Sequence, residues 1–212
     1  MRWRPRFEAL VEELGSTPGV RLTSAVIGPP TDPHVLAAAR VVAGAAWPHE
    51  MTALYEELGH VDIAYEIDGS GHGGRIAIPT VTDVWDHGGH EDELWFDWLV
   101  EEDPDHPFTH VRPIDRFADE AYAVLHPVPS DGPAMVCFHV CGESLLPTGL
   151  TYAEWLDHLL LARGASYWLA LATGPRSRRT WVEENLDRVA ALFPSFDPGA
   201  LTPVRPLPPI VG

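Results

Sequence analysis

The sequence contains no lysine and no glutamine, so its permanent positive charge comes from 14 arginines alone. Without lysine, the chain cannot form a Schiff base on a lysine or hold a phosphate with a P-loop lysine. Two cysteines, Cys137 and Cys141, are too few for a disulfide framework. No apolar run reaches the ~18 residues of a membrane span, and Glu8 and Glu12 interrupt the stretch where a signal peptide would need apolar residues. We therefore expect a soluble, cytoplasmic protein.

Basic residues are also few relative to acidic ones. The chain has 31 aspartates and glutamates, and its formal net charge is −17. Such a protein is repelled by nucleic-acid phosphates and by anionic membranes, whereas it attracts a basic protein. Its 212 residues are enough for one domain with its own hydrophobic core.

Apolar residues recur at helical spacing in six segments of the chain. Thr151 with Glu154 and Thr180 with Glu183 have the spacing of capping boxes, which mark helix starts. The segment that follows Asp32 is apolar on nearly all sides, which predicts a buried helix. The expected helices cover residues 7–14, 33–46, 48–58, 113–125, 151–163 and 180–193.

Strict alternation of apolar and polar residues over 61–67 predicts a strand with one face in water, as antiparallel sheets have. Residues 75–79 are expected to pair with it as a hairpin, and residues 16–30 to form a loop. Further strands are expected over 94–100 and 134–140. This order favours an α+β fold, a mostly antiparallel sheet with helices packed against it. We expect one domain over residues 1–193 and a proline-rich tail over 194–212.

Motifs for nucleotide binding and nucleophilic catalysis find little support. Gly69, Gly71 and Gly74 have the spacing of a dinucleotide fingerprint, but the residues after them predict a strand. The fingerprint needs a helix N-terminus to hold the pyrophosphate, so a hairpin loop is the better interpretation. No Gly-x-Ser-x-Gly motif is present.

Eleven histidines raise the question of a metal site. The densest group of potential ligands contains two histidines separated by two glycines, which gives no fixed geometry. A second group alternates along a predicted strand, where it is equally compatible with a buried face. The candidate groups are Asp86, His87, His90 and Glu91; Cys137, His139 and Cys141; and His106 with His110.

An acidic segment rich in aromatic residues lies between Arg75 and Arg112, where no lysine or arginine occurs. Acidic side chains accelerate the encounter with a basic protein, and aromatic side chains anchor interfaces. The same pattern is also typical of a solvated sheet edge with tryptophans in the core. The predicted partner-binding residues are Glu91, Asp92, Glu93, Trp95, Asp97, Trp98, Glu101, Glu102, Asp103 and Asp105.

Three stretches resemble the SMI1/KNR4 (SUKH) superfamily: AAWPHEMTALYEELGHVDIAYEI, GGRIAIPTVTDVW and YAEWLDHLLLARG. The resemblance extends over about residues 33–170, whereas the acidic insertion around 88–110 and the C-terminal helix with its tail depart from the pattern. It implies an α+β fold and a non-enzymatic binding module. Bacterial members are proposed as immunity proteins that neutralise toxins, often nucleases, inside the producing cell.

We therefore expect a binding protein, with no catalytic residue, cofactor or metal, that occludes the site of a basic partner such as a toxin. Neither nucleic acid nor a membrane is expected as a partner. One alternative is a metal-assisted hydrolase that uses His87 and His90. The other is a regulatory scaffold without a toxin partner, which the sequence does not separate from an immunity protein.

Overall fold

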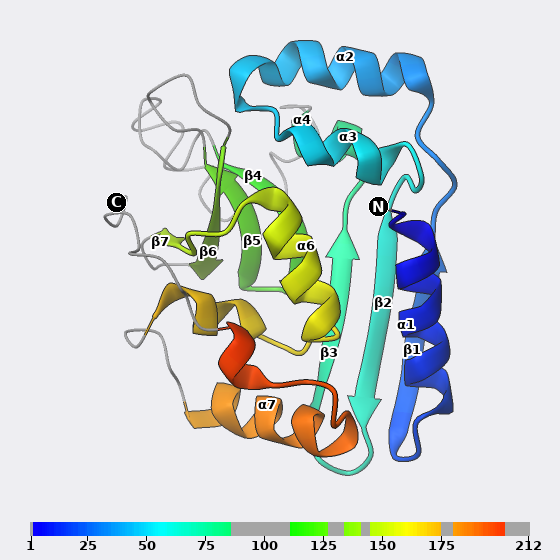
Figure 1. Ribbon diagram of the computed structural model, residues 1–212, viewed down its shortest axis with the longest axis vertical. Coiled ribbons are helices and arrows are strands. Elements are labelled where there is room, and N and C mark those ends of the chain that lie inside the picture. Colours follow the sequence, from blue (N-terminus) through cyan, green and yellow to red (C-terminus); the bar gives the residue numbers. More distant parts are fainter. Residues whose placement is uncertain (1, 86–110, 127–133, 141–144, 175–179, 202–212) are drawn as a thin grey trace.

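The computed structural model describes residues 2–85, 111–126, 134–140, 145–174 and 180–201. Within them, helices pack against two antiparallel sheets, so the expected α+β fold is confirmed (Figure 1). The first sheet has the order β1-β2-β3, and the second has the order β4-β5-β6-β7. The strands are β1 (Val20–Ile27), β2 (Val61–Ile67), β3 (His72–Ile78), β4 (Arg112–Ala118), β5 (Ala121–His126), β6 (Met135–Val140) and β7 (Leu146–Pro147).

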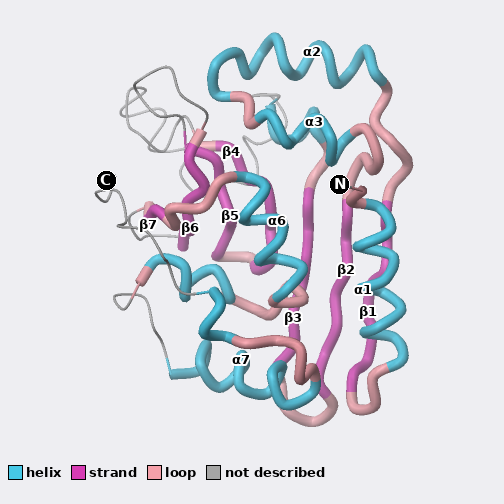
Figure 2. The backbone as a smooth tube through the Cα atoms, viewed as in Figure 1, coloured by secondary structure: helices cyan, strands magenta, loops and turns pink. Residues whose placement is uncertain are grey.

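The helices cover the sheets and cap the ends of the molecule (Figure 2). None of the helices in the described ranges is long and apolar enough to cross a lipid bilayer. The α-helices are α1 (Arg4–Ser16), α2 (Pro33–Ala43), α3 (His49–Tyr55), α4 (Val81–Trp85), α6 (Tyr152–Leu161) and α7 (Thr180–Leu192). Short 3₁₀ turns are η1 (Gly44–Ala46), η4 (Trp168–Thr173) and η6 (Pro198–Leu201).

The predicted β2–β3 hairpin is present, with all seven residues of each strand paired. Gly69 and Gly71, in the turn between the strands, have φ angles of +66° and +67°. Backbone in this left-handed region favours glycine. The glycine spacing therefore serves a turn, and a strand rather than a phosphate-binding helix follows it.

The two sheets meet where β3 lies beside β4. A side chain makes the link between them: the Asp115 carboxylate accepts a hydrogen bond of 2.7 Å from the backbone N–H of Ala77. Asp115 has no exposed surface. A carboxyl group thus joins β3 to β4 from inside the core.

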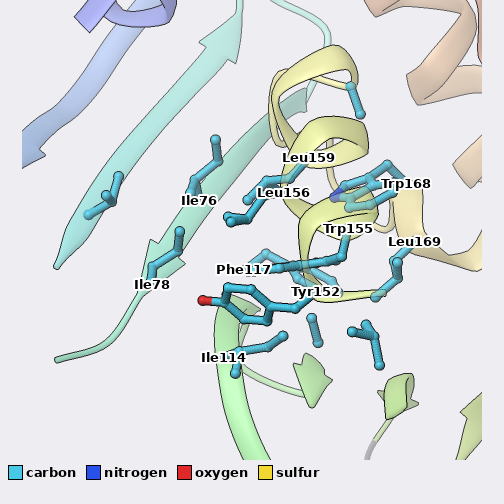
Figure 3. Close-up of a cluster of buried hydrophobic side chains, with 14 of the residues drawn as sticks. Ile76, Ile78, Ile114, Phe117, Tyr152, Trp155, Leu156, Leu159, Trp168 and Leu169 are labelled. Atoms are coloured by element: carbon cyan, nitrogen blue, oxygen red, sulfur yellow. The ribbon is translucent and has the colours of Figure 1, made fainter. Parts of the chain in front are cut away.

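The main core lies between the sheets and α6 (Figure 3). Trp155 of α6 and Trp168 of η4 are fully buried, and Ile76 of β3 and Ile114 of β4 face the same cluster. Large aromatic side chains contribute most of the apolar area that such a core removes from water. The core therefore joins both sheets and the C-terminal helices into one body.

The predicted capping box of α6 is confirmed. The Thr151 hydroxyl accepts from the Glu154 backbone N–H at 3.2 Å, and the Glu154 carboxylate accepts from the Thr151 N–H at 2.9 Å. After α6, the buried Arg163 forms a bidentate ion pair with Glu13 of α1 and donates to the Ser195 hydroxyl. These contacts connect α6 with α1 and with the residues that follow α7.

The predicted secondary structure of two segments is wrong. Residues 16–30 contain β1, where valine, leucine and isoleucine side chains form a strand between Pro18-Gly19 and Gly28. Residues 113–125, predicted as a helix, form β4 and β5. Every residue of β5 is buried, so this strand lacks the alternation that identifies a strand with one face in water.

The remaining predictions concern the C-terminal segment and the acidic segment. The predicted strand over 94–100 lies outside the described residues. In the proline-rich C-terminal segment, Phe196 and Leu201 are buried against the core, and residues 202–212 lie outside the described ranges.

Candidate protein-docking surface

Helix α2 begins and ends with well-defined caps. The Asp32 carboxylate accepts a 2.7 Å hydrogen bond from the His34 N–H, and Pro33 occupies the first turn. At the other end, Gly44 has a φ of +55° and its N–H bonds to the Arg40 carbonyl. The helix is therefore defined by its own sequence rather than by extensive packing.

The prediction that α2 is buried is wrong. Only Leu36 and Ala39 are buried, because they form the narrow stripe that faces the body of the protein. Val41 is 82% exposed, Val42 61% and Val35 38%, so α2 carries three of the five large hydrophobic side chains that are exposed in the described residues. Figure 2 shows why: α2 lies at the outer edge of the molecule, beyond α3.

A hollow of about 500 Å³ lies at the C-terminal end of α2. Its wall includes the ring of Trp47, which is held in place from two sides. The indole N–H donates to the Thr52 hydroxyl at 3.1 Å, and the ring lies 5.9 Å from that of Trp85. The hollow is lined by Ala37, Arg40, Val41, Gly44, Trp47 and His49.

The α2 region is depleted in acidic residues compared with the rest of this acidic chain. Between Glu13 and Glu50 the sequence has a single acid, Asp32, and its carboxylate caps the helix. The α2 helix itself contains one charged residue, Arg40, which is exposed. We call the exposed side chains of α2 together with the hollow the α2 face; it is mainly apolar, and its polar side chains are those of Arg40, His34 and His49.

The partner-binding residues predicted from the sequence, between Glu91 and Asp105, lie outside the described residues. The same is true of the histidine groups at 86–91 and 106–110, and of Cys141, the third member of the group with Cys137 and His139. Sequence reasoning missed the α2 face because a helix that is apolar on all sides is normally buried. The scarcity of acids around α2 was the available signal that this segment differs from the rest of the surface.

The buried titratable groups are part of the interior. Burial lowers the pKa of His139 to about 4 and raises that of Cys137 to about 12, so both side chains are neutral near pH 7. Cys137 packs in a small apolar cluster with Val124 and Leu145. Among the residues that the structure describes, no group of three or more His, Cys, Asp or Glu side chains could hold a metal ion.

No protein-family model matches the chain, and no curated protein matches it. The surface of the protein therefore provides the evidence for its function.

Proposed function

We propose that this chain is a non-enzymatic, cytoplasmic protein-binding module whose partner is a basic protein. The observation that carries the proposal is the apolar face of α2, with Val41 and Val42 largely in water. Contiguous exposed apolar side chains mark interaction sites, because a protein partner removes them from water on binding. At about 25 cal/mol per Å² of apolar surface, covering such side chains is a favourable contribution to binding.

The charge of the whole molecule favours a basic partner. Several arginines are held in ion pairs with neighbouring acids, including Arg6 with Asp157 at 2.6 Å and Arg75 with Asp62 at 3.1 Å. Since these pairs cancel locally, the remaining acids dominate the long-range field of a chain with net charge −17. Such a field increases the association rate of a basic protein, while the α2 face supplies apolar contact.

The resemblance to the SUKH superfamily suggests a specific version of this function. In it, the chain is an immunity protein that covers the active site of a toxin, most simply a nuclease with a basic, phosphate-binding surface. The acids predicted to bind the partner, from Glu91 to Asp105, would then contact that basic surface.

The proposal is tested by capturing partners from a lysate of the source organism at low and moderate salt, with identification by mass spectrometry. We expect wild-type protein to retain a basic protein that moderate salt releases. That protein, purified, should bind wild type at least tenfold more tightly than Val41→Asp/Val42→Asp. If it is a nuclease, its activity should fall when wild type is added.

A matched variant addresses the acidic segment: replacing Glu91, Asp92 and Glu93 by their amides should slow association and weaken its salt dependence. If no basic protein binds wild type at low salt, the proposed function is wrong. If the partner binds but is neither toxic nor enzymatic, the chain is a regulatory scaffold rather than an immunity protein.

A further inference from the structure

We infer that the α2 face docks an amphipathic helix of the partner, and that this helix carries a carboxylate that pairs with Arg40. The inference rests on the proposal that the chain binds a protein. It assigns the position of the contact and the chemistry of the element that makes it.

The shape of the α2 face fits a helix. Exposed apolar side chains follow the length of α2, and two of them, Ala37 and Ala38, are small enough to let another helix approach closely. The hollow beside Trp47 has room for one larger apolar side chain from that helix. An apolar stripe with one filled pocket is the usual way in which a helix anchors in a groove.

The charge of the α2 face determines which charged side chain the docked helix must carry. Arg40 lines the hollow and is exposed, and within the described part of the chain no ion pair involves it. Docking an apolar helix would remove water from this guanidinium, and a charge that loses water without gaining a partner weakens binding. A carboxylate on the docked helix compensates for that loss, and its pairing with arginine is directional.

A second copy of this chain is a poorer occupant. Two chains with a net charge of −17 each repel one another, and α2 has no carboxylate of its own to offer the Arg40 of the other copy. The 11 residues of α2 form a helix only ~16 Å long. The surface of so short a helix is much smaller than the ~800 Å² per partner that stable dimers bury. A partner with basic residues elsewhere gains additional attraction from the acids of this chain, whereas a second copy does not.

The test uses a displayed library of helical peptides with a fixed apolar stripe and one randomised position beside it. The library is selected against the full-length wild type and against the Arg40→Glu variant. We expect wild type to enrich aspartate or glutamate at the randomised position, and Arg40→Glu to enrich lysine or arginine. A synthetic glutamate peptide should bind wild type about tenfold more tightly than its lysine counterpart, and Arg40→Glu should reverse this order.

Two control variants show whether the effect is local. Arg188→Glu makes the same change of charge at another exposed arginine, on α7, and should enrich the same peptides as wild type. Val41→Asp should enrich no peptide while keeping the circular dichroism spectrum of wild type. Because both side chains are in water, neither substitution disturbs the core.

Two results of the selection would overturn the inference: no peptide enriched by wild type, or the same residue enriched by wild type and by Arg40→Glu. A dimer in sedimentation that Val41→Asp abolishes would make the occupant a second copy. Peptides enriched only after Trp95→Ser/Trp98→Ser would make the occupant this chain's own segment. A basic partner that binds Val41→Asp as well as wild type would also overturn the inference; it would remove the α2 face from the proposed function, and the binding of a basic protein would still stand. If peptides are enriched as expected but no basic protein is captured, the docking of a helix on the α2 face stands and the proposed basic partner is wrong.

Discussion

Apolar side chains are usually buried and charged ones exposed, and two regions of the molecule reverse this: helix α2 and the junction between β3 and β4. On α2, Val41 and Val42 lie largely in water, whereas at the junction the carboxyl group of Asp115 is fully buried. Within the described chain, one oxygen of the Asp115 carboxyl group accepts the hydrogen bond from the Ala77 N–H, and the other oxygen is buried without a hydrogen-bond partner. Among the described residues nothing covers the exposed side chains of α2. A buried polar group that has a hydrogen-bond partner within the chain is part of the fold. Apolar side chains that the chain leaves in water indicate a binding surface.

The largest effect is expected at the junction. Ile114 is fully buried beside Asp115, so Ile114→Ala should lower the free energy of unfolding by about 4 kcal/mol through lost apolar burial and a residual cavity. Urea unfolding followed by tryptophan fluorescence measures this change. Val42→Ala on α2 is the matched control and should change stability by less than about 0.5 kcal/mol. Equal costs for the two variants would contradict the contrast between the regions.

The pH dependence of stability tests the buried carboxyl group. Burial raises the pKa of Asp115 from 3.8 to about 7, with the nearby Asp62 raising it further and Arg75 and the Ala77 N–H opposing the shift. Because the folded protein holds this proton more tightly than the unfolded chain, the contribution of Asp115 is fully present below about pH 4. It is lost as the pH rises towards 7, by on the order of 4 kcal/mol.

Asp115→Asn isolates this contribution, since the amide oxygen can still accept from Ala77 but does not titrate. Urea unfolding at several pH values between 4.5 and 8.5 should show a shallower decline for Asp115→Asn than for wild type. All other acids are present in both proteins, so the difference belongs to this side chain. Parallel pH profiles would mean that Asp115 does not carry a raised pKa.

An intermediate effect is expected at the start of α2. Asp32→Ala removes the side chain that accepts from the His34 N–H and should destabilise α2 by about 1 kcal/mol. Faster amide hydrogen exchange within residues 36–43, with little change in β2, would show that the loss is local. Asp32→Ser keeps a capping oxygen and should restore most of the protection.

The smallest effect is expected on the α2 face itself. Val41→Ser/Val42→Ser should change the free energy of unfolding by no more than about 0.5 kcal/mol, because both side chains are exposed and serine has a helix propensity similar to that of valine. Thermal unfolding of the double variant is sufficient to test this. A loss of 2 kcal/mol or more would show that the chain itself covers these side chains, and the comparison with Asp115 would no longer hold.

Local signals predicted a large part of the fold. The β2–β3 hairpin followed from alternation, and α6 from Thr151 and Glu154, because neighbouring residues alone determine these features. The prediction failed for β4 and β5, where Ile114 and Phe117 have helical spacing but belong to a strand with most of its residues buried. β5 is buried along its whole length and has no exposed face, so periodicity gives no evidence of it.

The candidate site shows the same limit. The sequence established the acidity of the molecule and the apolar character of α2, since each depends on residue type alone. The packing of distant segments decides which side of α2 faces the body of the protein. It also brings Asp115 to Ala77, 38 residues away in the sequence. Exposure is a property of the whole assembled chain, so only the tertiary structure could identify the α2 face as a surface.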